Sequence, residues 1–352
     1  MKLLNRHVGG SVLAATFVVL LVLVGIDVIS AIIDQSGDLE GNYDFSEVLI
    51  YVLLTVPGRI QEYIPFAALV GALIGLGTLA SQSELIVMRA SGVATGSIIW
   101  MVMKPAILLM LLGLLISEYV APPAEQMAGT RRALAQNDAQ AFSVKSGVWN
   151  REGNEFMHFN AVESLGVVHG VTLFRFNKTQ QLQSALFAET ARFQGDRWQL
   201  EDGVQTQLHD RSTSRSSFDT LEWPSTLSPK LLSLVILEPD DLSVSGLWSY
   251  ANHLKEQGQS AGDYLLAFWS KLLQPLGTAS LVLIAISFVF GPLREVTMGY
   301  RIFVGVLVGI VFRTSQDMLG PSSLVFGFQP MFAILVPILM CTAIGVILLR
   351  RS

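Results

Sequence analysis

Residues 8–33 read VGGSVLAATFVVLLVLVGIDVISAII, a stretch in which Asp27 is the single charged residue. A helix rises 1.5 Å per residue, so about 20 apolar residues are enough to cross ~30 Å of hydrocarbon. The stretch follows Lys2 and Arg6 and is longer than the apolar region of a cleavable signal peptide. It therefore predicts an uncleaved first membrane helix.

Five further apolar stretches follow, at residues 64–80, 98–120, 268–290, 302–319 and 331–349. The first of these is short by itself, but residues 48–56 precede it across Pro57-Gly58, which predicts one longer, kinked helix. The 352-residue chain has 51% hydrophobic and 14% charged residues and a mean hydropathy of +0.51, which is too apolar for one water-soluble core. The predicted fold class is membrane α-helical, with six transmembrane helices.

Small residues recur at a spacing of four within two of these stretches. Gly71 and Gly75 form one such pair, and Gly305 and Gly309 form another. This spacing lets the backbones of two membrane helices approach closely. Although residues 75–80 (GLGTLA) resemble part of a dinucleotide-binding fingerprint, they lie inside a membrane stretch, so helix packing is the better interpretation.

The third and fourth spans are separated by about 145 residues that hold 12 of the 23 Lys and Arg and 17 of the 28 Asp and Glu. Alternating segments occur at 155–160, 171–177, 182–193 and 197–208, which predicts an all-β antiparallel domain, a sandwich or a barrel. Asp240 and Asp241 are placed to cap a connecting helix over 242–257. The expected organisation is residues 1–120 for helices 1–3, 121–265 for the β domain with its connecting helix, and 266–352 for helices 4–6.

The basic residues of the short loops and termini fall on one side of the six predicted spans: Lys2, Arg6, Arg89, Lys104, Arg294, Arg301, Arg350 and Arg351. Loop 34–47 lies on the other side and has five acidic residues and no Lys or Arg. Because basic loops stay in the cytoplasm, both termini are predicted to be cytoplasmic and the β domain periplasmic, in a bacterial inner membrane.

Several classes of chemistry lack support in the sequence. No Walker A motif is present, so any ATP is expected to be used by a partner subunit. The five histidines show no metal-ligand spacing, and Cys341 is the single cysteine. We expect no catalytic residue, no cofactor and no metal. The net charge of −5 shows no basic footprint for nucleic acid.

The loop after the second span carries a short helical segment at 81–92. Ser81 and Glu84 stand at capping-box spacing, and apolar residues including Leu85 and Met88 surround most of its circumference, with Arg89 after them. An apolar loop helix predicts a coupling helix that docks on a cytoplasmic ATPase. The alternative is a re-entrant segment packed on its own bundle, in which Glu84 is only a cap.

Ionisable residues within the spans are predicted to lie in the outer part of the membrane, among them Lys271, Arg313 and Asp317. A proton or ion carrier would instead place carboxylates near the midplane. Charges at headgroup height suit a protein that handles a charged amphiphile. The plain alternative is that Arg313 and Asp317 form an i, i+4 ion pair and that the helix ends snorkel.

The motifs resemble the LptF/LptG family of lipopolysaccharide export permeases over nearly the whole chain. The residues that carry the resemblance are 66–77 (FAALVGALIGLG), 83–92 (SELIVMRASG), 120–122 (VAP), 125–127 (EQM), 269–271 (WSK) with 274–275 (QP), and 290–294 (FGPLR).

The resemblance implies a jellyroll-like outer domain, a heterodimer with LptF, a cytoplasmic LptB ATPase dimer and a regulatory LptC helix. It implies extraction of lipopolysaccharide from the outer leaflet of the inner membrane toward a periplasmic bridge. Glu84 matches the coupling-helix glutamate of the family, and Arg132 a basic residue beyond the third span. Family members carry basic residues near the outer end of the first helix, which this chain lacks. Substrate contact is therefore expected from Arg131, Arg132 and Lys271, with helix anchoring as the alternative.

The sequence thus favours a transport permease subunit that is not itself an enzyme. A membrane-anchored scaffold that recruits periplasmic proteins is the main alternative, and a secondary transporter is a third. Charges at the outer leaflet favour transport over the scaffold. The lack of midplane carboxylates argues against a secondary transporter.

Overall fold

The computed structural model describes residues 2–37, 39, 43–137, 148–163, 166–177, 179–195, 197–209, 212–225, 238–256, 258–291 and 296–351. Arg294, used above for the orientation, lies outside these residues. The chain divides into two compact units, and each is described by itself. The first comprises residues 1–30, 56–121 and 243–352, and the second comprises residues 31–55 and 122–242.

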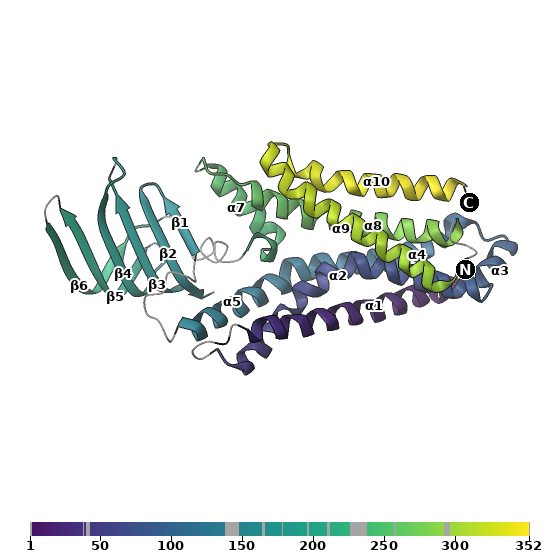
Figure 1. Ribbon diagram of the computed structural model, residues 1–352, viewed down its shortest axis with the longest axis horizontal. Coiled ribbons are helices and arrows are strands. Elements are labelled where there is room, and N and C mark those ends of the chain that lie inside the picture. Colours follow the sequence, from purple (N-terminus) through teal and green to yellow (C-terminus); the bar gives the residue numbers. More distant parts are fainter. Residues whose placement is uncertain are drawn as a thin grey trace. The chain divides into compact units, whose positions relative to one another are not determined.

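The described residues contain six helices long and apolar enough to cross a membrane, as predicted. Their elements are α1 (Lys2–Ser36), α2 (Phe45–Ser81), α4 (Thr95–Leu115) continued by the π-helix η1 (Ile116–Val120) and α5 (Ala121–Asn137), α8 (Gly262–Phe290), α9 (Met298–Phe326) and α10 (Pro330–Arg351). The predicted longer second helix is confirmed, because α2 runs without interruption through Pro57 and Pro65. The short helix α3 (Glu84–Ala90) and both chain ends lie at one end of the bundle (Figure 1).

The bundle is organised around α2 and α8. Within the candidate spans, 67% of the apolar window of α2 and 56% of that of α8 are buried, against 11% for α1 and 17% for α9. Side chains of α2, α4, α8 and α10 form one continuous core, among them Leu73, Val102, Leu281 and Ile338. The outer helices therefore leave most of their apolar surface uncovered by this chain.

The glycines of α2 bring α1 into backbone contact, as the spacing predicted. A Cβ atom added at Gly71 would overlap the Cα and Oγ1 atoms of Thr16, and one added at Gly75 would lie 2.7 Å from the Cα of Val12. Separations this short leave no room for any side chain at the two glycines. The approach is possible only because both positions lack a Cβ.

The glycines of α9 accept side chains of α2 in the same way. A Cβ atom at Gly305 would overlap Cδ1 of Leu73, and one at Gly309 would lie 2.5 Å from Cε2 of Phe66. The small-residue pair on α9 is thus also used for close packing, on a different neighbour from the pair on α2. Together, the two pairs fix α1 and α9 against α2.

The second unit contains a single six-stranded sheet among the described residues: β1 (Val148–Glu152), β2 (Glu155–Glu163), β3 (Val167–Phe176), β4 (Leu182–Phe193), β5 (Trp198–His209) and β6 (Ser212–Trp223). Every strand pairs antiparallel with the next in sequence (Figure 1). The expected all-β antiparallel domain is confirmed. The crossovers of a jellyroll stay a prediction from the family resemblance.

The two faces of the sheet differ in character. One face carries the apolar core of the domain, in which Trp198 and Trp223 are fully buried with Phe159. On the opposite face, the ring of Trp149 lies 5.0 Å from that of His158 and stacks 5.9 Å from that of Phe174. The alternation predicted from the sequence is therefore present, but both faces carry aromatic residues.

The predicted connecting helix is α7 (Val244–Glu256), which follows the 3-10 turn η2 (Pro239–Asp241). Its cap differs from the prediction, because Asp240 and Asp241 lie in that turn. The hydroxyl of Ser243 accepts a hydrogen bond from the N–H of Gly246 at 3.0 Å, which makes Ser243 the capping residue.

Candidate functional site

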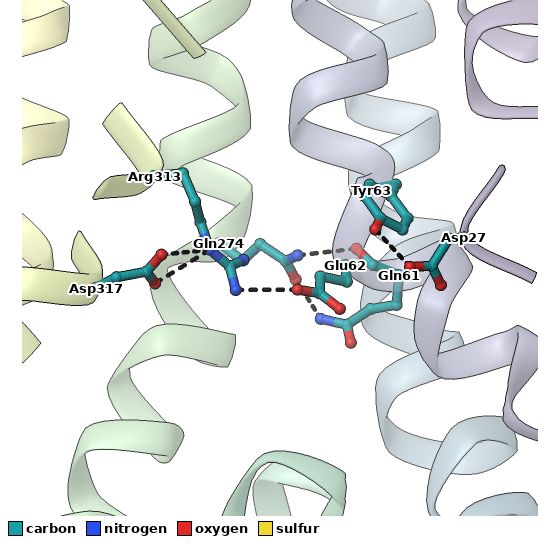
Figure 2. Close-up of polar contacts among 7 residues, drawn as sticks. All are labelled: Asp27, Gln61, Glu62, Tyr63, Gln274, Arg313 and Asp317. Carbon is teal, nitrogen blue, oxygen red and sulfur yellow. Dashed lines mark hydrogen bonds and ion pairs between the residues drawn. The ribbon is translucent and has the colours of Figure 1, made fainter. Parts of the chain in front are cut away.

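A belt of polar side chains crosses the bundle at one level and joins α1, α2, α8 and α9. Its members, most of them drawn in Figure 2, are Asp27, Arg59, Gln61, Glu62, Tyr63, Lys271, Gln274, Arg313 and Asp317. Charged and amide groups are costly inside a membrane unless they find partners. The belt meets this requirement through contacts between helices far apart in sequence.

The first contact joins α1 to α2. The carboxylate of Asp27 forms an ion pair with the guanidinium of Arg59. It also accepts a hydrogen bond from the hydroxyl of Tyr63 at 2.9 Å (Figure 2). Both charged side chains are about three-quarters buried. The lone charge of the first apolar stretch is thus neutralised by its neighbouring helix.

The second contact joins α2 to α9. Arg313 donates to Glu62 at 2.9 Å and lies 3.1 Å from the carboxylate of Asp317, so one guanidinium bridges two carboxylates (Figure 2). The i, i+4 ion pair considered from the sequence is present. The contact with Glu62 was not predicted, because nothing in the sequence relates positions so far apart.

The third contact joins α2 to α8. The side-chain amide of Gln61 donates to Oε1 of Gln274 at 2.5 Å, and the amide of Gln274 donates to the carbonyl oxygen of Gln61 at 2.9 Å (Figure 2). Lys271 precedes Gln274 by three residues on α8 and is buried. This reciprocal amide pair fixes the register of α2 on α8 at the level of the belt.

The belt lies far from the end of the bundle that holds α3. At 1.5 Å per residue, four of its members stand ~22 to ~29 Å from that end, counted from Val8 for Asp27, from Ser81 for Glu62, from Phe290 for Gln274 and from Met298 for Arg313. A hydrocarbon layer is ~30 Å thick, so the belt lies beyond its midplane. The depth of the belt in the membrane stays a prediction, because it is obtained by the same count as in the sequence.

Arg131 and Arg132 belong to the second unit, where both contact residues of the segment that contains loop 34–47. Arg131 forms a two-pronged contact with the carboxylate of Glu47, at 2.8 and 3.2 Å. The guanidinium of Arg132 lies 5.5 Å from the ring centre of Tyr51 and 6.0 Å from that of Tyr43, within cation–π range. The acidic loop therefore supplies a partner for Arg131, which the sequence had not indicated.

Helix α3 forms at the predicted place, but its N-terminus is not the predicted capping box. The hydroxyl of Ser81 donates to the carbonyl of Thr78 at 2.8 Å and belongs to the end of α2. Ser83 precedes α3 in the left-handed conformation and makes no side-chain cap. The carboxylate of Glu84 lies instead 2.8 Å from Nε2 of His7 on α1. Glu84 therefore contacts another helix and does not cap α3.

The apolar residues of α3 divide into two sets. Leu85 and Met88 are buried in the core of the bundle, whereas Ile86 and Val87 are each 65% exposed, and Arg89 is exposed beside them. Leu85 and Met88, expected at an ATPase contact, are therefore the residues that attach α3 to its own bundle. The exposed apolar surface consists of Ile86 and Val87.

The C-terminus of α3 is sharply defined. Gly92 adopts φ 88°, its N–H bonds to the carbonyl of Arg89 at 3.0 Å, and the N–H of Val93 bonds to the carbonyl of Met88 at 3.1 Å. This double closure is the Schellman motif, which favours glycine at the left-handed position. Helix α3 is thus a seven-residue helix between α2 and α4 whose end is set by Gly92.

The structure shows contacts that sequence reasoning missed, above all Asp27 with Arg59, Gln61 with Gln274, and Glu84 with His7. One usable signal was present in the sequence, namely that polar residues at similar depth in different spans must pair. It could not say which residues pair. The guanidinium groups of the belt already donate hydrogen bonds to carboxylate oxygens. The same N–H groups can donate to the oxygens of a phosphate.

Comparison with known proteins relates the full chain to one family. The model of the family described as "Lipopolysaccharide export system permease LptF/LptG" matches residues 6–351. The chain is 39% identical over 353 residues to the lipopolysaccharide export system permease protein LptG of Escherichia coli K12, which covers 99% of this chain and 98% of that protein. It is 35% identical over 340 residues to the LptG protein of Haemophilus influenzae, covering 96% and 95%.

Proposed function

The chain belongs to the LptF/LptG family of lipopolysaccharide export permeases, and from this premise we propose its place in an ABC-type exporter. As a multi-pass inner-membrane permease of this family, it acts in lipopolysaccharide export. We propose that it extracts lipopolysaccharide from the outer leaflet of the inner membrane and passes it to a periplasmic bridge toward the outer membrane. The observation that carries this proposal is the match over residues 6–351.

The proposed orientation has both termini in the cytoplasm and the β sheet in the periplasm. Basic residues of α3 and of both chain ends support it, because cytoplasmic loops are enriched in Lys and Arg. In this orientation the polar belt lies in the outer half of the membrane. That is the level at which the headgroup of an outer-leaflet lipid meets the bundle.

We propose that the permease works as a heterodimer with LptF, with an LptB ATPase dimer and LptC as further subunits. The small buried share of α1 and α9 supports additional membrane partners, since these helices leave apolar surface for another chain or for lipid. The sequence contains no Walker A motif, which supports ATP use by a separate subunit and no cofactor in this one.

Helix α3 is the proposed coupling element. Ile86 and Val87 offer an exposed apolar pair, with Arg89 and Glu84 at its rim, which suits a groove on a cytoplasmic partner. Leu85 and Met88 anchor the other side of α3 in the bundle core. A movement of the partner would therefore pass through α3 into the core.

The proposed substrate contacts are the arginines of the belt and of α5, together with Lys271. Arg313 and Arg59 are held by carboxylates, and a lipid phosphate that enters the bundle can exchange with these partners because the geometry is alike. Arg132 lies against two tyrosine rings, and its guanidinium supplies the paired, always-charged donors that suit an anion. Arg131, paired with Glu47, and Asp317, paired with Arg313, would complete this path.

The test is release of lipopolysaccharide from proteoliposomes that contain the complex purified with this chain. ATP should drive release into a soluble periplasmic acceptor, and Arg132→Glu should reduce release far more than Arg132→Lys, with subunit composition unchanged. A scaffold would recruit the acceptor but give no ATP-dependent release. Equal release by the two Arg132 variants would leave helix anchoring as the role of that residue.

A further inference from the structure

The third span contains a wide turn directly before a double proline. Residues Ile116–Val120 form the π-helix η1, in which the N–H of Ala121 bonds to the carbonyl of Ile116, five residues back. Pro122 and Pro123 follow, and neither has an N–H to donate. Each proline ring would also collide with the carbonyl four residues before it, at Glu118 and Tyr119. The helix avoids the collision by widening one turn.

Glu118 projects from this wide turn to the start of α7. Its carboxylate accepts hydrogen bonds from the backbone N–H of Ser245, at 3.3 Å, and from the hydroxyl of the same residue. That N–H is one of the first in α7, where backbone donors lack partners within the helix and a negative charge is favourable. Glu118 is thus a second cap on α7, supplied by another helix.

The two residues of this contact lie close to two different points at which the chain passes from one compact unit to the other. The chain leaves the first unit after Ala121 and re-enters it at Ser243, so Glu118 and Ser245 stand three and two residues from these crossings within the same unit. A single contact therefore ties together the outgoing and the returning chain.

Ser117 is the buried polar residue of the wide turn. Its side-chain oxygen is buried and has no hydrogen-bond partner among the described residues. In the spans, Thr16, Thr78 and Thr278 instead donate to the carbonyl four residues earlier. The carbonyl four residues before Ser117 is that of Gly113 in α4, and Ser117 does not use it, so its hydroxyl adds no hydrogen bond that would stabilise this turn.

We propose that η1 is a hinge in the third span and that Glu118 is the positioning residue that carries its motion to α7. The hinge bends where the two prolines and the wide turn remove regular i→i−4 hydrogen bonds, while the bond from Glu118 to Ser245 stays closed and moves the two chain crossings together. This hinge rests on the proposed function and deepens it. It assigns the route by which movement of the bundle reaches the segment that leads to the sheet.

The first test separates coupling from assembly. Glu118→Ala should lower lipopolysaccharide released per ATP hydrolysed about tenfold, the scale expected for losing hydrogen bonds to a charged acceptor. Glu118→Gln, which keeps one acceptor oxygen, should retain most of the release, and Ser245→Ala should fall between them. Glu256→Ala removes a carboxylate from the far end of α7 and serves as the matched control.

The second test addresses the hinge itself. Pro122→Ala with Pro123→Ala restores two N–H donors and removes both collisions, so residues 116–121 should become regular helix and exchange their amide hydrogens more slowly. Release per ATP should fall with the complex intact. A bismaleimide bridge between cysteines at positions 118 and 245, in a Cys341→Ala background, should leave release unchanged.

The outcomes distinguish this inference from the function on which it rests. A wild-type complex that shows no ATP-dependent release overturns the proposed function. Where the wild type is active, normal coupling in Glu118→Ala, or unchanged amide exchange and release in the double proline variant, overturns the hinge. Loss of release in the bridged protein would mean that the contact opens, contrary to the proposal.

Discussion

Helix α2 is held by its neighbours in two different ways along its length. Toward the α3 end, α1 and α9 contact it through glycines, at Gly71 and Gly75 on α2 and at Gly305 and Gly309 on α9. Toward the other end, the same helices are joined to it by ion pairs, Asp27 with Arg59 and Arg313 with Glu62. One region relies on close backbone contact, and the other on charged side chains.

The difference shows how a membrane bundle can be rigid at one level and exchangeable at another. Close backbone contact depends on shape and has no substitute once a side chain is added at the glycine. An ion pair depends on charge, so a phosphate or another anion can replace either carboxylate. The glycine level sets the positions of α1 and α9, and the belt level is where a charged lipid can act on them.

The largest effect on the stability of the bundle is expected where the glycines of α2 contact α1. Gly71→Leu would place a side chain into Thr16, so α1 must move away from α2, at a cost of about 3 kcal/mol or more. Thermal unfolding in detergent and lipopolysaccharide release should both show the loss. Gly25→Leu on α1, where a Cβ atom meets nothing within 4 Å, is the matched control. Equal stability of the two variants would refute close contact at Gly71.

The next effect concerns the ion pair at the belt. Asp27→Ala leaves the largely buried Arg59 without this carboxylate and should destabilise the bundle by about 2 kcal/mol. Asp27→Leu combined with Arg59→Met should recover most of that stability, because an apolar pair avoids both desolvation costs. If the belt acts on lipid, the double variant should still fail to release lipopolysaccharide. Normal release by a stable double variant would make the pair purely structural.

A smaller effect on stability, with a large effect on coupling, is expected at α3, which combines an apolar anchor with polar contacts. Ile86→Asp changes an exposed residue and should alter stability by no more than about 0.5 kcal/mol. It should nevertheless reduce copurification of the ATPase. Leu85→Asp introduces a charge into the core and should unfold the α3 end. An Ile86→Asp complex with normal ATPase content would remove α3 from the interface.

The smallest effect on stability is expected in the sheet. A titratable side chain is buried there, and it lacks the hydrogen-bond partners that the charged residues of the belt have. Nε2 of His158 has no hydrogen-bond partner among the described residues, and burial lowers the pKa of this histidine from its ordinary 6.5. The unfolded chain therefore binds the proton more readily. The stability contributed by neutral His158 is fully present above pH 6.5 and is lost as the pH falls from there toward the lowered pKa.

Thermal unfolding followed by tryptophan fluorescence between pH 8 and 5 measures this dependence, since Trp149 contacts His158. His158→Phe should flatten the profile. An unchanged slope in that variant would assign the dependence to other groups.

Much of the fold was predictable because its signals are local. Residues 182–193 alternate over their full length and form β4 with the predicted bounds. The six apolar stretches became six long helices because hydrocarbon leaves a backbone no other hydrogen-bond partner than its own. The cap of α7 was misplaced because Ser243, Asp240 and Asp241 are all suitable capping residues, and only the backbone geometry selects among them.

The site was predicted only in outline. The sequence placed Lys271, Arg313 and Asp317 at one level of the membrane, since depth follows from counting residues along a helix. It left the partners of these residues open, because pairing depends on the rotation and register of separate helices.

The sequence by itself determined the number of spans, the antiparallel strands of the second unit and the expected level of the charges, because each follows from composition and periodicity within one segment. Tertiary structure alone decided that Glu84 meets His7, that Leu85 faces inward while Ile86 faces outward, and that Glu118 caps α7. Those contacts depend on which surfaces of distant segments pack together. That choice is made by the free energy of the whole bundle and is encoded in no single stretch of the chain.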